Sequence, residues 1–353
     1  MATRALFAIP GDIETLTGGY GYDRRMLAEL GACGVEIAHL KLPDGFPFPD
    51  AAALAQSLSL LSGVGADQVL LVDGLALGAL PPQALAGLKA PLVALVHHPL
   101  GLESGLDPAT ARALIENERA ALAHARHVIV TSETTRANLI ADFAVPAQRV
   151  TVAEPGTDPA PRFHGSVGGG LELLAVGSIT PRKGHIVLVE ALAGLFDLPW
   201  RLTVIGSPDR DPACAAELRT AIAALGLEDR VQLAGEVSEG SVGAAYANAD
   251  LFVLPSFYEG YGMVLSEAMA RGLPIVTTTG GAAAQTVPDA AALKVPPGDV
   301  PALRAALRSV IADKDLRAGL ADASWKAGQG LPRWSDGAKV IADVLKAVNG
   351  APA

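Results

Sequence analysis

The sequence predicts an α/β protein made of two doubly wound parallel-sheet domains. In each half of the 353-residue chain, apolar runs of strand length alternate with amphipathic segments of helix length. This order is typical of parallel strands joined by right-handed helical crossovers. A stretch dominated by Pro and Gly, residues 154–170, interrupts the alternation near the middle and indicates a linker. A chain of this length that is 50% hydrophobic can bury two cores of ordinary size.

The first half opens with an apolar run at residues 5–9, which predicts its first strand. A loop over residues 10–21, which contains Gly18-Gly19-Tyr20-Gly21, follows this strand, and a helical pattern then continues to about residue 30. A Gly pair in this place either carries backbone contacts to a phosphate or simply forms a turn, and its spacing does not match GxGxxG. The other predicted strands cover residues 35–40, 69–72, 92–96, 128–131 and 149–152, and the clearest helices cover residues 108–125 and 133–143.

The second half repeats this architecture without repeating the sequence. Its predicted strands cover residues 171–176, 201–205, 231–233, 251–254, 275–278 and 293–295, and its helical patterns cover residues 185–195, 264–271, 300–312 and 315–327. A last amphipathic segment, residues 335–348, places five aliphatic side chains on one face. Such a face needs a partner to pack against.

Residues 255–281, PSFYEGYGMVLSEAMARGLPIVTTTGG, are central to the functional prediction. They follow a buried strand and read as a Gly-rich loop, a helix and a second strand. Gly260 and Gly262 allow backbone N–H groups to approach an anion, and the helix N-terminus adds a partial positive charge. Glu259 and Glu267 flank this pole and suit the hydroxyl groups of a nucleotide sugar. The alternative is that Glu259 only favours the helix start and that Glu267 is a solvated helix residue.

Two further groups of residues follow strands in the sequence. Arg182 and Lys183 precede a helix, where cations oppose the helix dipole unless they neutralise a ligand such as a diphosphate. An exposed basic pair is the alternative. His97 and His98 end an apolar strand, where they either cap the sheet or contact a ligand. No third metal ligand is evident near them in the sequence.

Composition limits the class of protein. The formal net charge of −10 argues against nucleic-acid binding and against purely electrostatic attachment to anionic lipid. The two cysteines, Cys33 and Cys214, form neither a disulfide framework nor a metal-ligand cluster, which fits a reducing compartment. The N-terminal apolar run is short for a signal peptide, and no segment approaches the length of a membrane span. We therefore expect a cytoplasmic protein.

The stretch around Glu259 and Glu267, eight positions apart in YEGYGMVLSEAMARGLPIVTTTGG, resembles the EX7E motif of the family 4 retaining glycosyltransferases. The resemblance implies the GT-B fold, in which two Rossmann-like domains face a central cleft and the last helix crosses back to the N-terminal domain. It places an acceptor-binding domain at residues 1–162, a donor-binding domain at 163–334 and the returning helix at 335–353. The implied activity is transfer of a sugar from a nucleotide diphosphate sugar, a UDP- or GDP-sugar, with retention of the anomeric configuration.

The resemblance also implies roles for individual residues. Glu267 would hold the ribose hydroxyls, and His97 rather than His98 would lie against the transferred sugar. Arg182 and Lys183 would stabilise the leaving phosphate, while Glu259 would hold the sugar. Further donor contacts would come from Gly19, Val237, Gly260, Tyr261, Gly262 and Met263. Two positions depart from the family pattern: Ser178 stands where an Arg is usual, and Gln285 stands where many relatives carry Glu.

We expect no cofactor and no metal, because no DxD cluster stands at a strand end. Asp209-Arg-Asp211 matches the letters but lies in a predicted loop. The acceptor stays open between a lipid, a glycan and a small molecule, and the sequence does not predict the oligomeric state. Peripheral membrane contact through the helix at 108–125, as in some relatives, is weakened by the acidic balance. The competing functions are a GT-B sugar-nucleotide epimerase and a non-catalytic nucleotide-sugar-binding module.

Overall fold

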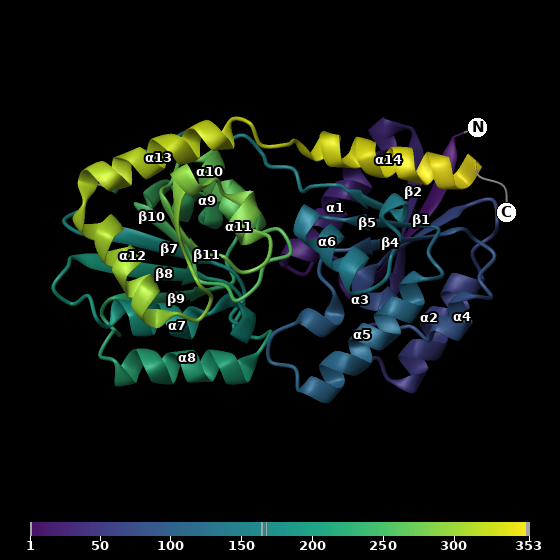
Figure 1. Cartoon of the computed structure of the whole chain (residues 1–353), viewed down its shortest axis with the longest axis horizontal. Coiled ribbons are helices and arrows are strands. Elements are labelled where there is room, and N and C mark those ends of the chain that lie inside the picture. Colours follow the sequence, from purple (N-terminus) through teal and green to yellow (C-terminus); the bar gives the residue numbers. More distant parts are fainter. Residues whose placement is uncertain (1, 164, 167, 351–353) are drawn as a thin grey trace. The chain divides into compact units, whose positions relative to one another are not determined.

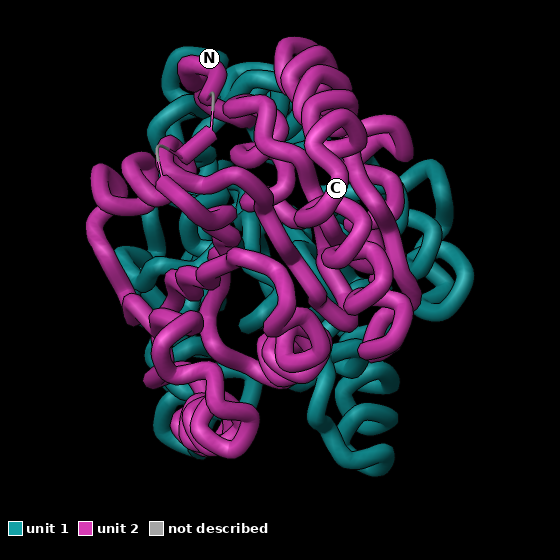
Figure 2. The backbone as a smooth tube through the Cα atoms, turned by 90° about the vertical axis from the view of Figure 1, so that its left-hand side faces the viewer, with its two compact units in different colours: residues 1–156, 332–353 teal, residues 157–331 magenta. Residues whose placement is uncertain are grey.

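The computed structural model describes residues 2–163, 165–166 and 168–350. They form two compact units, coloured separately in Figure 2: residues 1–156 with 332–353 make unit 1, and residues 157–331 make unit 2. The sequence had placed these boundaries after residues 162 and 334. Each unit contains one six-stranded sheet of parallel strands, and helices cover both faces of each sheet (Figure 1). The predicted fold class is confirmed.

Unit 1 is organised around a fully buried central part of its sheet. The strands run in the spatial order β2-β1-β3-β4-β5-β6. They are β1 (Thr3–Pro10), β2 (Val35–Leu42), β3 (Val69–Asp73), β4 (Leu92–Val96), β5 (His127–Val130) and β6 (Val150–Val152). The helices are α1 (Gly18–Glu29), α2 (Ala51–Ser62), α3 (Gly74–Leu77), α4 (Pro82–Leu85), α5 (Pro108–Leu122), α6 (Glu133–Ala141) and α14 (Trp334–Gly350). The C-terminal helix α14 lies against α1 and β1 (Figure 1), and Ile341, Val344, Leu345 and Val348 are among its buried residues.

The predicted loop over residues 10–21 is wrong at its end, because helix α1 already begins at Gly18. The hydroxyl of Thr17 accepts a hydrogen bond from the Tyr20 N–H group at 3.4 Å and caps the helix. This cap lets a pair of poor helix formers, Gly18 and Gly19, enter the first turn. Gly19 lies against His97, since a Cβ added there would lie 3.4 Å from Cδ2 of His97, which is an ordinary contact distance.

Unit 2 has the strand order β12-β11-β10-β7-β8-β9. Its strands are β7 (Leu171–Val176), β8 (Trp200–Ile205), β9 (Val231–Gly235), β10 (Leu251–Leu254), β11 (Ile275–Thr278) and β12 (Ala292–Val295). Its helices are α7 (His185–Leu192), α8 (Pro212–Ala224), α9 (Glu239–Asn248), α10 (Met263–Ala270), α11 (Ala283–Thr286), α12 (Val300–Ala312) and α13 (Lys314–Gly328). The predicted strands of this half are all present.

Each sheet has one place where the direction of strand succession reverses. In unit 1 it lies between β1 and β3, and in unit 2 it lies between β7 and β10. Loops that leave the carboxyl ends of two such strands diverge to opposite faces of the sheet and open a crevice. Open α/β sheets bind ligands in this crevice. The loops after β1, β3, β7 and β10 are therefore the first places to look for a site.

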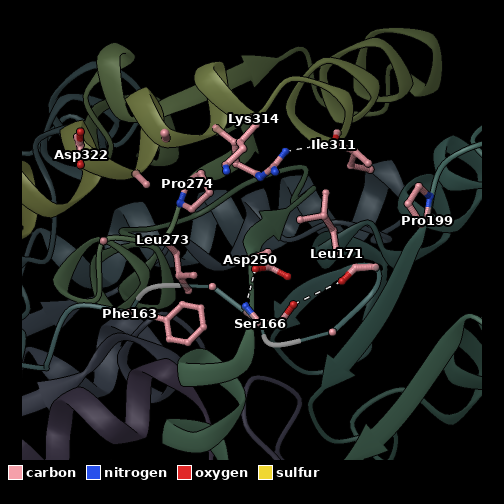
Figure 3. Close-up of a pocket in the computed structure, with 18 of the residues that line it drawn as sticks. Phe163, Ser166, Leu171, Pro199, Asp250, Leu273, Pro274, Ile311, Lys314 and Asp322 are labelled. Atoms are coloured by element: carbon pink, nitrogen blue, oxygen red, sulfur yellow. Dashed lines mark hydrogen bonds between the residues drawn. The ribbon is translucent and has the colours of Figure 1, made fainter.

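A cavity of about 610 Å³ lies at the other edge of the unit 2 sheet (Figure 3). Leu171 and Pro274 line it, and they mark the amino ends of β7 and β11. One of its two lining carboxylates, Asp250, accepts hydrogen bonds from the N–H groups of Ser166 at 2.7 Å and Glu172 at 2.8 Å, and the other, Asp322, is paired with Arg162. Because both carboxylates are used by the protein itself, we assign no chemistry to the cavity.

None of the helices within the described residues combines the length and hydropathy needed to cross a bilayer.

The loop after β4 is held by a buried acid of helix α5. Glu118 is 1% exposed, and its Oε2 accepts a hydrogen bond from the Leu100 N–H group at 2.9 Å. Its Oε1 has no hydrogen-bond partner in the described part of the chain. Burial raises the pKa of Glu118 from 4.5 to about 8, and the Leu100 contact opposes the shift only in part. The side chain is therefore mainly protonated at neutral pH.

We predict that Glu118→Gln makes the protein less sensitive to alkaline pH. A raised folded-state pKa contributes stability that is complete below pH 4.5 and is lost as the pH rises through about 8. The full shift corresponds to roughly 4–5 kcal/mol. Gln keeps an acceptor for Leu100 and cannot ionise. The free energy of unfolding of Glu118→Gln, measured by urea titration, should therefore rise relative to the parent from about pH 5 to about pH 9.

Glu116→Gln is the matched control, because Glu116 lies on the same helix and is exposed. Its pH dependence should follow that of the parent. Parallel curves for Glu118→Gln and the parent would show that Glu118 does not titrate in this range.

Candidate functional site

In unit 2, the loops after β7 and β10 are joined through their backbones. The N–H group of Phe257 donates to the carbonyl of Arg182 at 2.7 Å. Gly184 has a φ of +67°, and a Cβ added to it would lie only 2.3 Å from the carbonyl oxygen of Pro255. Only glycine fits this approach. The contact fixes the basic turn at 181–183 against the loop that carries Glu259.

A second glycine contact fixes the backbone of Glu259 itself. Its N–H group donates to the carbonyl of Gly280 at 3.2 Å, and its carbonyl accepts from the N–H group of Ala282 at 2.8 Å. Gly281 has a φ of +62°, and a Cβ there would lie 2.4 Å from the carbonyl oxygen of Glu259. The Gly280-Gly281 turn that ends the 255–281 stretch therefore has a structural reason, which is to let two backbone segments pair.

The side chain of Glu259 is buried among cations. It is 5% exposed, and its Oε1 lies 2.7 Å from Nζ of Lys183 and 3.6 Å from Nη1 of Arg182. The hydroxyl of Ser256 donates to the same oxygen at 2.5 Å. Burial by itself raises the pKa of Glu259, but the charges of Lys183 and Arg182 and these hydrogen bonds lower it below its ordinary value. Glu259 is thus ionised and holds both cations in place.

The basic turn is ordered by further contacts. Nη1 of Arg182 donates to the carbonyl of Tyr258 at 2.9 Å. His185 begins helix α7 and is buried, and its pKa is lowered to about 4 by burial and by the nearby charge of Lys183. His185 is therefore neutral at physiological pH and adds no charge of its own. Two fixed cations remain at this edge of the sheet.

Helix α10 begins at the same edge. Its N-cap is Gly262, with a φ of +91°, and no side chain among the described residues caps its first turn. Thr286 donates its hydroxyl to the carbonyl of Tyr261 at 2.6 Å and so fixes the approach of the loop. The N–H groups that start with Met263 form a partial positive pole that can bind an anion. Gly260 lies in the loop that leads into this pole.

Glu267 lies one and a half turns into α10 and is half-buried. The hydroxyl of Tyr246 donates to its Oε2 at 2.9 Å, and the guanidinium of Arg271 lies 4.6 Å above the Tyr246 ring. No hydrogen bond to Oε1 of Glu267 is found among the described residues. Burial raises the pKa of this carboxyl, while Tyr246 and Arg271 oppose the rise. One oxygen is therefore fixed by the protein and the other can accept a bond from a ligand hydroxyl.

The other predicted donor residue of this unit, Val237, follows β9 and lies just before Ser238, which caps helix α9. The two positions that depart from the family pattern are close to the same edge. Ser178 lies in the loop after β7, and Gln285 lies in the short helix α11. Asp211 of the DxD-like triplet caps helix α8 by accepting the Cys214 N–H group at 2.9 Å. The role of Asp211 in the structure is therefore to cap this helix.

In unit 1 the structure brings together residues that the sequence analysis did not connect. Gly19 lies next to His97, because a Cβ added to this glycine would lie 3.4 Å from Cδ2 of His97. Nε2 of His97 lies 3.0 Å from Oδ1 of Asp23 and 4.0 Å from Oδ2 of Asp73. Among the described residues, these three form the one group of side chains whose atoms could jointly ligate a metal ion. The sequence could have indicated Asp73 as a site residue, because it ends a strand that lies beside the strand before His97. The sequence could not have indicated Asp23, because this residue lies inside a helix.

The predicted site residues therefore fall into two sets. Gly19 and His97 belong to unit 1. The set in unit 2 consists of Arg182, Lys183, Val237, Glu259, Gly260, Tyr261, Gly262, Met263 and Glu267. In each unit these residues follow a strand at the reversal or the strand next to it, except Val237, which follows β9 at the edge of the unit 2 sheet.

Comparisons with known proteins give matches along most of the chain. Residues 158–326 match the family model described as glycosyl transferases group 1, and residues 10–156 match the glycosyl transferase 4-like domain. The MMP alpha-(1->4)-mannosyltransferase of Mycolicibacterium hassiacum is 29% identical over 293 residues, which are 77% of this chain and 69% of that protein. The D-inositol 3-phosphate glycosyltransferase of Pseudarthrobacter chlorophenolicus is 32% identical over 200 residues, 53% of this chain and 47% of that protein.

Solved structures resemble the whole chain. A sucrose-phosphate synthase from Thermosynechococcus elongatus has a TM-score of 0.84 at 21% identity and covers 99% of this chain and 100% of its own. The Anabaena protein Alr3699/HepE in complex with UDP-glucose has a TM-score of 0.77 at 18% identity and covers 98% and 99%. At these identities the likeness concerns the fold.

We predict that Lys183 and Glu259 are energetically coupled. Glu259→Gln leaves two cations without their buried partner, and Lys183→Met leaves a buried carboxylate with Arg182 at 3.6 Å. Breaking a buried ion pair from one side typically costs about 3–5 kcal/mol. In the double variant both members of the Lys183–Glu259 pair are neutral, and Arg182 keeps its hydrogen bond to the Tyr258 carbonyl. The loss of unfolding free energy in the double variant should therefore be well below the sum of the single losses. Urea titration of the four proteins measures this difference.

The control cycle uses Arg308→Met and Asp197→Asn, which break an exposed ion pair of 2.7 Å in the same unit. Exposed pairs are screened by solvent, so this cycle should be additive. Additive losses at Lys183 and Glu259 as well would show that the buried contact does not hold the site.

Proposed function

Because the chain belongs to the glycosyl transferases of group 1, we propose that it transfers a hexosyl group from a nucleotide diphosphate sugar to an acceptor hydroxyl with retention of the anomeric configuration. The observation that carries this proposal is the arrangement at the carboxyl edge of the unit 2 sheet. Two fixed cations and the N-terminus of α10 lie beside a carboxylate that keeps one oxygen for a ligand.

The cations and the helix pole suit the diphosphate. When the bond between the anomeric carbon and the phosphate oxygen breaks, the departing diphosphate takes the electron pair and gains negative charge. Lys183 and Arg182 are held by Glu259 before the reaction, so they need no reorganisation to stabilise this charge. The N–H groups at the start of α10 add a partial positive charge from the same edge. This arrangement supplies the electrostatic stabilisation that a metal ion would otherwise supply, so we propose that transfer is metal-independent.

Glu267 suits the nucleoside. Its Oε2 is held by Tyr246, so its Oε1 has a fixed direction from which it can accept hydrogen bonds from ribose hydroxyls. We propose a UDP- or GDP-sugar as donor, because one fold neighbour is described in complex with UDP-glucose and one relative, 37% identical over 161 residues, is named GDP-mannose:cellobiosyl-diphosphopolyprenol alpha-mannosyltransferase. The acceptor contributes a hydroxyl group and belongs to one of three classes: lipid, glycan or small molecule.

We predict that UDP- or GDP-sugars raise the thermal melting temperature and that nucleotide diphosphate is released from the stabilising donor in the presence of EDTA. Binding to the folded state raises its stability by mass action. A panel of UDP-, GDP- and ADP-sugars in a thermal-shift assay selects the donor, and a coupled assay for free nucleotide diphosphate then measures turnover.

Each other result of this experiment rejects a named part of the proposal. Loss of turnover in EDTA with recovery on Mg²⁺ or Mn²⁺ rejects metal independence. Conversion of the donor to an isomeric nucleotide sugar, without any acceptor, identifies an epimerase. Donor binding with no turnover in the presence of lipid, glycan and polyol acceptors identifies a binding module.

We predict that Glu267→Ala weakens binding of the donor and of free nucleotide diphosphate alike. Loss of a hydrogen bond to a charged group costs about 1.5–3 kcal/mol, or roughly 10- to 150-fold in Kd. Isothermal titration calorimetry with UDP and GDP measures the effect. Glu217→Ala, an exposed residue of helix α8, is the control and should bind as the parent does. Unchanged affinity in Glu267→Ala would assign Glu267 to the support of Tyr246 alone.

A further inference from the structure

The carboxyl edge of the unit 1 sheet differs in charge from that of unit 2. The segments that follow its six strands cover residues 11–17, 43–50, 74–81, 97–107, 131–132 and 153–156. These segments contain no Lys and no Arg. They contain seven acids, which are Asp12, Glu14, Asp44, Asp50, Glu103, Asp107 and Glu154. An anion that reaches these segments therefore meets carboxylates and no Lys or Arg side chain.

The helix starts at this edge are capped by the protein itself. An open helix N-terminus can bind an anion because its first N–H groups have no partner in the helix. In unit 1, the first α-helix after each of the strands β1 to β5 donates at least one such N–H group to a capping side chain. The caps of α1, α2, α3, α5 and α6 are Thr17, Asp50, Asp73, Asp107 and Ser132. Three of these caps are carboxylates, so they also place negative charge at the helix start.

The corresponding helix starts of unit 2 are open. The first α-helices after the two strands at its reversal, α7 and α10, have Gly184 and Gly262 as N-caps, and no described side chain caps either of them. At the reversal of unit 1, the caps Thr17 and Asp73 occupy the starts of α1 and α3. The unit 2 edge thus suits a diphosphate, and the unit 1 edge does not.

The two histidines after β4 do not change this balance. Nε2 of His97 lies 3.0 Å from Oδ1 of Asp23, so a positive charge on this ring would be matched by a carboxylate that already contacts it. Oδ2 of the buried Asp23 has no hydrogen-bond partner among the described residues. Both ring nitrogens of His98 are shielded from solvent. The group around His97 therefore offers acceptor atoms rather than net positive charge.

Two arginines in the helices that follow these segments are used by the protein. Arg24 of α1 donates to the carbonyls of Ile13 and Thr15 and so holds the segment after β1. Nη1 of Arg136 in α6 lies 3.4 Å from the carboxylate of Glu133. Neither guanidinium is therefore left as an isolated charge for a ligand.

The remaining charges of this region leave the edge acidic. The guanidinium of Arg25 lies 5.1 Å from the centre of the Trp334 ring. Lys41 and Arg112 are exposed, but they belong to β2 and α5 and not to the segments at the edge. Burial and the charge of Glu133 raise the pKa of Glu154, which shows that carboxylates of this edge are close enough to repel one another.

A transferase binds two substrates, and the edge of unit 2 suits the nucleotide diphosphate. We propose that the carboxyl edge of unit 1 binds the acceptor, and that this acceptor is uncharged or carries an amine and has no phosphate or carboxylate beside its reacting hydroxyl. This inference rests on the proposed transferase function and adds the charge class of the acceptor. An anionic acceptor would meet like charges at this edge, which weakens its binding. Hydroxyl groups find hydrogen-bond acceptors there, and an amine finds opposite charge.

The first experiment compares acceptors that share hydroxyl groups and differ in charge. The full chain receives the donor selected by thermal shift. The acceptors are D-glucose, glucosamine and glucose 6-phosphate, with myo-inositol and an inositol phosphate as a second set. We expect kcat/KM to be at least about 10-fold higher for the uncharged and amine-bearing members than for the phosphorylated members. Equal or faster transfer to the phosphorylated members overturns the proposal.

Acceptors that are larger than these sugars are tested in an extract of the organism that makes the protein. The aqueous and the organic extract are each divided on an anion-exchange column before the reaction, and each fraction is incubated with donor labelled in its sugar. We expect the label in a product from the fraction that passes through the column. A labelled product from the column-bound fraction alone overturns the charge class and leaves the transferase function intact. Absence of label from every fraction and from both acceptor sets rejects the transferase function, and this inference with it.

Charge variants test whether the edge of unit 1 is the part that faces the acceptor. Glu14 is exposed, and no hydrogen bond or ion pair of its side chain is found among the described residues. Glu14→Lys should raise kcat/KM for a phosphorylated acceptor relative to an uncharged one roughly 3- to 10-fold, and salt should reduce the effect. The Kd for UDP and GDP should not change.

Asp142→Lys is the matched control, because this exposed residue follows the last turn of α6, the helix that returns to the amino edge of the sheet. It should keep the acceptor preference of the parent. Equal acceptor preferences in Glu14→Lys, Asp142→Lys and the parent would overturn the placement of the acceptor at this edge. A changed Kd for UDP or GDP in Glu14→Lys would overturn it as well, because the variant would then act on the donor.

Discussion

The buried charge of Glu259 is the constraint on which the unit 2 site depends. A carboxylate removed from water needs close cations and hydrogen-bond donors, and here Lys183, Arg182 and Ser256 supply them. The cations come from the loop after β7, and the carboxylate comes from the loop after β10. Their meeting requires a close backbone approach that only glycine permits at position 184, and Gly281 allows the turn after β11 to hold the backbone of Glu259. The positive charge that faces a diphosphate is therefore fixed by a structural ion pair.

The two units treat buried carboxyl groups in opposite ways. In unit 2, Glu259 has cationic partners, and its pKa is lowered although burial alone would raise it. In unit 1, no Lys or Arg of the described residues forms an ion pair with Asp23, Asp73 or Glu118, and burial raises the pKa of each. The first arrangement keeps its charge over the physiological pH range. In the second arrangement the pKa of Asp23 is raised to about 7 and that of Glu118 to about 8, so the charge of these two groups changes near neutral pH.

Sheet topology explains why these groups lie where they do. Each sheet reverses its strand succession once, and the loops on the two sides of that reversal diverge. In unit 2 the basic turn and the Glu259 loop leave the two strands at the reversal. In unit 1, α1 follows one of the two strands at the reversal and Asp73 ends the other. His97 follows β4, the next strand in the sheet. The two sheets differ in strand order, but both carry polar groups at the carboxyl ends of their strands. The matches to glycosyl transferase families cover both units.

The sequence by itself determined the α/β class, the strands, and the membership of Arg182, Lys183 and Glu259 in loops at strand ends. Apolar runs, helix periodicity and glycines record these features locally, because each depends on residues close together in the chain. It did not determine the start of α1, where the Thr17 cap outweighs the Gly pair. The sequence also did not determine which side chains contact one another in the folded protein. The pairing of Glu259 with Lys183, and the convergence of Asp23, Asp73 and His97, join residues that lie 76, 74 and 24 positions apart. Only the folded sheets bring such residues within 4 Å, and only burial then decides whether a carboxyl group keeps its charge or its proton.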